Sequence, residues 1–321
     1  MLIIIFLYLY LATNNYYIVD ARITSISQDQ EDLDLERQLK LINKPPRKTI
    51  QANGYIVDCI DINKQPAFDN PLLKNHKIQL KPSFEVTSIE STRLSSIGIE
   101  EDLCPAGTVP IRRTTKDDLI RAKQLPDKNI SILNNDIPGR HYAGLKLNKD
   151  GSHYFAISGI IDTYNLPVQN PDQITSAYIY LSNGGSENDK NVIMTGWEDP
   201  ETKNWWVMLQ NKSLGYYPEV LFSNLAFANL GGWTGMTSTP TGIPSPPMGS
   251  GHLPDNNLLR SCYIRQMHFQ IDTSKNLGPI KDVYAVPFKD SSCYGVQYEG
   301  WNDEIQGFAM LFGGPGGNCG E

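Results

Sequence analysis

The 321-residue sequence lacks several patterns that would assign a function at once. Its five histidines never occur as H-x-x-x-H or H-E-x-x-H, so we expect neither a metal site nor a bound cofactor. Its 28 Lys and Arg against 35 Asp and Glu give a net charge of −7, and no basic stripe is present. This charge argues against a nucleic-acid partner. After the first residues, no apolar run is long enough to cross a bilayer.

Cysteine is scarce and widely spaced, and no C-x-x-C pair occurs, so zinc binding and dithiol redox chemistry have little support. In an exported chain such cysteines usually form disulfides, and here one must be left over. We expect Cys59 to pair with Cys104, because both lie beside β-rich segments of one compact stretch. The five cysteines are Cys59, Cys104, Cys262, Cys293 and Cys319.

The one strongly apolar stretch, Leu2–Leu11, has the length of a signal-peptide core. Val19–Asp20–Ala21 places small residues at the −3 and −1 positions, which predicts cleavage after Ala21. A membrane anchor is the alternative, but the polar residues Thr13–Asn15 interrupt the run before it reaches a spanning length. We therefore expect the mature chain to have no membrane segment.

Two N-x-Ser triplets, beginning at Asn129 and Asn211, are candidate glycosylation sites and suit an exported chain. Together with the leader they predict a secreted, extracellular protein, with the vacuole as another possible destination.

The first part of the mature chain predicts a small α+β module. Asp32–Asn43 has apolar residues at helical spacing, and the β-rich segment Tyr55–Ile62 follows it. Cys104–Arg113 is a second extended segment, and Thr115–Leu125 predicts a helix with Thr115 as its N-cap. Thr87–Asp102 has the composition of a surface loop, and the Asn- and Asp-rich Pro126–Pro138 that of an interdomain linker.

From His141 onward, short strand patterns recur between Gly, Pro and Asn clusters, which is typical of an antiparallel β-sandwich or barrel. Within one of these segments, Met267, Phe269 and Ile271 alternate with polar residues, which indicates one buried and one wet face. The expected strands are Phe155–Tyr164, Ala177–Leu181, Val192–Trp197, Trp205–Leu209, Ser213–Tyr217, Tyr263–Asp272, Val283–Phe288, Cys293–Tyr298 and Phe308–Phe312.

Several long ordered strings resemble the neprosin family of secreted plant proteins. In the first half these are Leu41–Pro45, Asp58–Asp61, Gln65–His76 and Cys104–Arg113. In the second half they are Asn204–Trp206, Leu214–Pro218, Pro246–His252, Cys293–Val296 and Gly313–Gly317.

This resemblance implies an N-terminal activation domain and a C-terminal all-β antiparallel sandwich of glutamic peptidase type, acting on peptides or proteins next to proline. In such an enzyme one glutamate is ionised and activates water, while its partner is protonated and assists the carbonyl or the leaving group. The expected disulfides are then Cys59–Cys104 and Cys293–Cys319. Cys262, on a predicted strand, is left as a buried free thiol.

The sequence departs from the family pattern at both catalytic positions. The first family glutamate precedes a Gly–Trp pair, where this chain has Met194, and the second follows a Gly–Gly pair, where it has Trp233. Neither side chain can take up or release a proton near neutral or acid pH, so the water-activating pair cannot form at these positions. Glu198 has the same strand parity as Met194 and is a weak substitute, because its place beside an Asp–Pro turn predicts a solvated loop residue.

The sandwich is also predicted to be shortened. Trp197 runs directly into Glu198, where family members carry several more strands and another cysteine pair. A true internal deletion after about residue 197 and a gene model that skipped an exon both account for this junction.

The sequence therefore predicts three parts: a signal peptide at 1–21, a neprosin activation or pro-region at 22–125, and a shortened neprosin-like sandwich at 126–321. We expect a secreted relative of proline-directed glutamic endopeptidases that is inactive or impaired, with an active acid endopeptidase as the alternative. A second alternative is a peptide- or glycan-binding sandwich, for which Trp205, Trp206, Tyr216 and Tyr217 offer a candidate aromatic platform.

Overall fold

A computed structural model describes most of the chain after the leader, in two units. Unit 1 comprises Met1–Ile78 and Leu94–Lys128, and unit 2 comprises Gln79–Arg93 and Asn129–Glu321. The leader, the 87–102 loop, nearly all of the expected linker and both candidate glycosylation residues, Asn129 and Asn211, lie outside the described residues. These are 28–52, 54–84, 104–124, 138–147, 151, 153–164, 166, 170, 172–184, 191–193, 196–209, 212–257, 260–271, 277–278, 286–289 and 292–319.

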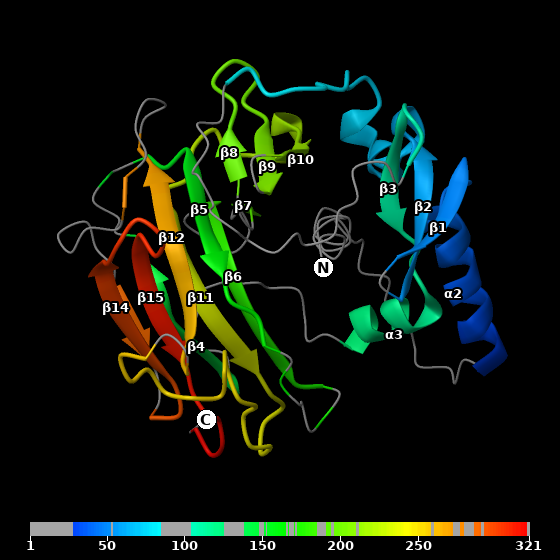
Figure 1. Ribbon diagram of the computed structural model, residues 1–321. Helices are drawn as coiled ribbons and strands as arrows, with labels where there is room; N and C mark the ends of the chain where they lie inside the picture. The colour runs from blue at the N-terminus through cyan, green and yellow to red at the C-terminus, as the bar shows by residue number, and fades with distance from the viewer. Residues whose placement is uncertain are drawn as a thin grey trace. The chain divides into compact units, whose positions relative to one another are not determined.

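Unit 1 is a small α+β module, as its sequence predicts (Figure 1). Its three strands form one antiparallel sheet in the order β1-β2-β3. β2 and β3, which precede and follow residues 85–103 in the sequence, are therefore neighbours in this sheet. The elements are α2 (Gln28–Ile42), β1 (Lys48–Ala52), β2 (Tyr55–Asp61), β3 (Thr108–Arg112), α3 (Lys116–Gln124) and the 3₁₀ turns Ile62–Lys64, Pro66–Asp69 and Pro71–Leu73.

The start of α3 confirms the predicted cap. The hydroxyl of Thr115 accepts a hydrogen bond from the Asp118 backbone N–H at 3.2 Å. In return, the Thr115 backbone N–H donates to the Asp118 carboxylate at 2.8 Å. This reciprocal pair is a capping box that satisfies otherwise open amide donors.

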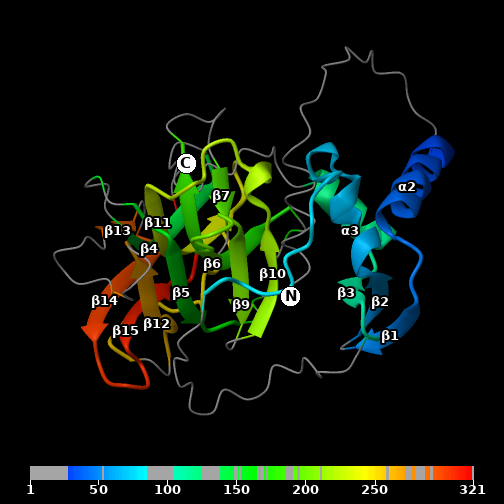
Figure 2. The same cartoon turned by 90° about the horizontal axis from the view of Figure 1, so that it is seen from above.

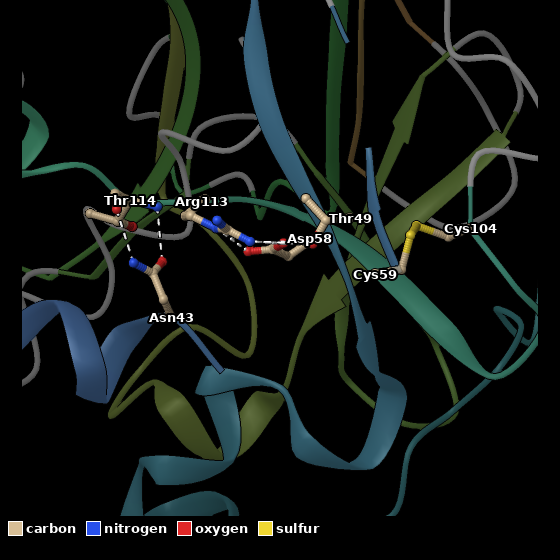
Figure 3. A network of polar contacts seen from close by, with 7 residues as sticks. All are labelled: Asn43, Thr49, Asp58, Cys59, Cys104, Arg113 and Thr114. Carbon is tan, nitrogen blue, oxygen red and sulfur yellow. Dashed lines mark hydrogen bonds and ion pairs between the residues drawn. A yellow bond between two sulfur atoms is a disulfide. The ribbon is translucent and has the colours of Figure 1, made fainter. Parts of the chain in front are cut away.

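A polar network ties the parts of unit 1 together (Figure 3). The Asp58 carboxylate is buried, and Arg113 donates to it from both Nε and Nη2, at 2.7 and 2.6 Å. Thr49 on β1 donates to the same carboxylate at 2.7 Å. Asn43, just after α2, exchanges two side-chain hydrogen bonds of 2.9 Å with the backbone of Thr114. The Asp58 carboxylate thus links β1 and β2 to Arg113, and the Asn43 side-chain amide links the end of α2 to Thr114.

The Cys59–Cys104 disulfide, expected from the sequence, closes the same sheet at the next residue of β2. Burial alone would raise the pKa of Asp58, but the hydrogen bonds from Arg113 and Thr49 and the Arg113 charge outweigh it. The pKa of Asp58 is therefore lowered from 3.8.

Unit 2 is a sandwich of two antiparallel sheets, which confirms the predicted fold class (Figures 1 and 2). The first sheet has the strand order β10 (Lys212–Tyr217), β9 (Trp205–Leu209), β8 (Gly196–Glu198), β5 (Ala156–Ile161), β12 (Cys262–Gln270), β15 (Phe308–Gly313) and β14 (Gly295–Trp301). The second has the order β13 (Val286–Lys289), β4 (Arg140–Lys146), β11 (Leu230–Ser238), β6 (Ile174–Asn183) and β7 (Asn191–Ile193). A 3₁₀ turn, Glu219–Leu221, follows β10.

The strand expected over Val192–Trp197 is split. Its first part is β7, which pairs with β6 in the five-stranded sheet. Its second part is β8, which lies between β5 and β9 in the seven-stranded sheet. Two residues separate the end of β7 in one sheet from the start of β8 in the other.

A β-bulge in β12 changes the predicted alternation. The pairing with β5 shifts between Arg265 and His268, and Gln266 has a φ of 49°. Because of this shift, Ile264 and Met267 are both fully buried although they are three positions apart, which in a regular strand would place them on opposite faces. Ile271, expected on the buried face, lies beyond the strand and is exposed.

The central strand of the five-stranded sheet, β11, is buried on both faces. Gly235 faces the other sheet, where a Cβ would lie 2.6 Å from the Phe312 ring of β15, so only glycine fits. On the opposite face, Met236 packs against a buried cluster that contains Tyr142 and Tyr178. A strand covered on both sides needs no polar alternation, which is why the sequence pattern did not reveal it.

We predict that Asp58→Asn destabilises unit 1 by about 1–3 kcal/mol, the scale of hydrogen bonds to a charged group. Because the folded-state pKa of Asp58 is lowered, this contribution is present above about pH 3.8 and fades as the pH falls below it. Hydrogen exchange of the β1–β3 amides at several pH values measures both effects. Asp69→Asn, which loses an exposed pair with Lys44, is the control. An equal effect of both variants would contradict the prediction.

Candidate functional site

Trp233, expected at the position of the second family glutamate, lies in the interior of the sandwich. Trp233 is fully buried on β11, and its indole Nε1 donates to the Ser158 carbonyl of β5 at 2.8 Å. A Cβ on Gly159 would lie 3.2 Å from that nitrogen and from the methyl groups of Ile179 and Ile264. The indole thus bridges the two sheets.

This arrangement differs from what a water-activating carboxylate needs. A general base needs an accessible proton acceptor beside the reacting atoms, and an indole offers only a donor. The Trp233 donor is already used by Ser158. Met194, expected at the first family position, lies outside the described residues.

Glu198 is buried, which corrects the expectation of a solvated loop residue. It is the last residue of β8, and its backbone N–H donates to the Phe155 carbonyl at 2.8 Å. Only 1% of its side chain is exposed, and Lys203 Nζ lies 3.4 Å from Oε1. Burial raises the pKa of Glu198, while the Lys203 charge lowers it in part. Pairing of β8 with strands on both sides turns the expected turn residue inward.

The next residue, Asp199, has the opposite electrostatic character. Burial by itself raises the pKa of Asp199, but hydrogen bonds from Ser83, Gln79 and Thr202 outweigh it and hold the pKa well below its usual range. The fully buried carboxylate also accepts the Glu201 N–H at 3.0 Å. These hydrogen bonds therefore stabilise the ionised form of the Asp199 carboxyl group.

The two neighbouring carboxyl groups do not form a catalytic pair, even though their pKa values are driven apart. The Glu198 side chain is closed off from solvent, and both oxygens of Asp199 are occupied by N–H and O–H donors. Neither group can hold a substrate water in this structure. Sequence reasoning singled out Glu198 but missed Asp199, although Asp–Pro followed by Thr202 is a recognisable Asx-turn pattern.

The candidate aromatic platform is not a surface feature. Trp205, Trp206 and Tyr217 are buried, and Trp205 Nε1 donates to the Leu225 carbonyl at 2.8 Å. Tyr216 is half-buried and lies against Trp206 with ring centroids 4.8 Å apart. These four residues stabilise the end of the seven-stranded sheet, and so do not offer stacking faces for sugars.

The remaining cysteines lie as the sequence predicts. Cys293 and Cys319 form a disulfide, and Cys262 is a buried free cysteine. Its thiol donates to the Asp162 carbonyl at 3.4 Å, and burial raises its pKa to about 12. A protonated, buried thiol is not a nucleophile.

The described residues hold neither a metal-binding cluster nor a membrane-spanning helix. No group of three or more His, Cys, Asp or Glu side chains is placed to hold a metal ion there. Nor do these residues contain a helix of the length and apolarity that a membrane span requires.

The chain joins an α+β module to an antiparallel sandwich, and family comparisons assign a class to each part. Residues 49–159 match the model of the neprosin activation peptide, and residues 168–315 match the neprosin model. The chain belongs to the neprosin family. The activation-peptide match includes Gln79 and Ser83, which contact Asp199 in unit 2.

We predict that Trp233→Ala lowers the free energy of unfolding of the sandwich by about 3–5 kcal/mol, because it removes a buried indole between two sheets. Trp301→Ala, at an exposed site on β14, is the matched control and should cost no more than about 1 kcal/mol. Urea denaturation followed by near-ultraviolet circular dichroism measures both. A loss at Trp233 as small as that at Trp301 would show that the indole is not a structural bridge.

Glu198→Gln is expected to stabilise the protein at pH 7. Because burial raises the folded-state pKa of Glu198, its ionisation opposes folding increasingly as the pH rises above about 4.5. The variant should therefore have the higher Tm at pH 7, and the difference should vanish below pH 4.5. Glu201→Gln, at an exposed carboxylate three residues on, should show neither effect. A lower Tm for Glu198→Gln at pH 7 would mean that the Lys203 pair dominates.

Proposed function

We propose that this protein is a secreted neprosin-domain protein that does not cleave peptides by the paired-glutamate chemistry of its family. The observation that carries the proposal is Trp233, a buried indole bonded to Ser158 at the position of the second family glutamate. Without that carboxyl group, no second acid can share the proton transfers that peptide hydrolysis requires.

The carboxyl groups of Glu198 and Asp199 support the same proposal. Glu198 is buried away from solvent, and Asp199 is saturated by hydrogen bonds. Export is supported by two features: the leader pattern of the sequence, and the Cys59–Cys104 and Cys293–Cys319 disulfides, which form in oxidising compartments.

The second candidate function is peptide binding through the sandwich. It is favoured by the polar groups around Asp199, which engage an extended segment of the chain itself. The buried state of Trp205, Trp206 and Tyr217 argues against the glycan-binding alternative. Proline-directed acid endopeptidase activity is the competing proposal, and it would need a carboxyl pair elsewhere.

The test is an assay of the purified protein without residues 1–21, incubated at acid pH with a proline-containing peptide. We expect mass spectrometry to find the peptide intact, while pepsin under the same conditions shows that the assay detects cleavage. Clear cleavage that Glu198→Gln abolishes would overturn the proposal and assign the chemistry to Glu198. Cleavage that survives this substitution would also overturn it and require another carboxylate.

A further inference from the structure

The extended segment Gln79–Phe84, which we call the strap, belongs to unit 2 although it lies within the activation-peptide match. Its contacts come from one turn and one strand that are more than a hundred residues away along the chain. The turn is 199–204, between β8 and β9, and the strand is β10. The strap is therefore held by the sandwich through tertiary contacts.

The side-chain amide of Gln79 is bound at both ends. Its Oε1 accepts hydrogen bonds from Thr202 Oγ1 at 2.9 Å and from Asn204 Nδ2 at 2.8 Å. Its Nε2 donates to the Asp199 carboxylate at 2.9 Å, and its backbone N–H donates to the Tyr216 hydroxyl at 2.8 Å. A glutamate of the same shape would place its negative charge against Asp199, so this site is specific for the neutral amide.

Four residues further on, Ser83 makes a second pair of contacts with the same carboxylate. Its backbone N–H and its hydroxyl donate to the two oxygens of Asp199 at 2.7 and 2.6 Å. Asp199 itself is fixed by the Glu201 and Thr202 amides, and Asn204 by the Glu219 amide at 3.1 Å. The side chains of Asp199 and Asn204, which contact the strap, are thus held in place by residues outside the strap.

We propose that the 199–204 turn and Tyr216 form a peptide-binding site whose ligand is the chain's own strap. The site recognises the strap through Gln79 and Ser83. The strap reaches the sandwich from Ile78, and unit 1 resumes at Leu94. A cut in the 125–137 segment would leave the strap as part of the N-terminal fragment. The site would then hold that fragment to the sandwich without a covalent link. This inference holds whether or not the protein cleaves peptides.

The experiment uses the full chain without residues 1–21, with a recognition sequence for a site-specific protease inserted within 125–137. After cleavage at neutral pH, we expect the two fragments to elute together in size-exclusion chromatography. Gln79→Glu should weaken their association by at least about tenfold, because it places like charges together at a partly buried contact. Ser83→Ala, which removes one hydrogen bond to the anion, should weaken it less.

Asn75→Asp adds the same charge at an exposed position outside the strap and should leave the association unchanged. Circular dichroism and Tm of each uncut variant establish that it is folded before cleavage. Immediate separation of the wild-type fragments would overturn the proposal. So would a Gln79→Glu association as tight as that of the wild type, or an equal loss in Asn75→Asp.

Discussion

The hydrogen bond between the Trp233 indole and the Ser158 carbonyl joins the centres of the two sheets. Trp233 lies on β11, the middle strand of one sheet, and Ser158 lies on β5 of the other. Gly159 and Gly235 carry no side chains, so the layers can approach closely around this contact. Trp233 is a large side chain that fills the interior of the sandwich. The residue on which the proposed loss of family chemistry rests is therefore also one that stabilises the sandwich.

The turn after β8 shows how neighbouring carboxyl groups acquire different roles. Glu198 faces the interior, where burial raises its pKa, whereas Asp199 receives enough N–H and O–H donors to remain ionised. In a glutamic peptidase such a separation of pKa values would define an acid and a base. Here one group is inaccessible and the other is fully occupied, so the separation has structural consequences only. Asp199 organises its own turn and the strap with one charge.

Much of the fold follows from the sequence because it depends on local patterns. The Thr115 cap, the β9 strand and the two disulfides correspond to short signals that neighbours in space reinforce. β4 and β11 were missed because they are buried on both faces and lack alternation. The Asp199 site was missed because Gln79 and Asp199 are 120 residues apart. Their pairing depends on tertiary contacts that no local pattern encodes.

The central proposal is that the chain does not carry out the paired-glutamate peptide hydrolysis of its family. The most direct test is the intact mass of the full chain without residues 1–21 after incubation at acid pH, since its own activation peptide is present at equimolar amount. The account predicts a single unchanged mass at every time point. Cleavage within 85–137 at a rate that does not depend on protein concentration would contradict it, because this would show that the chain processes itself.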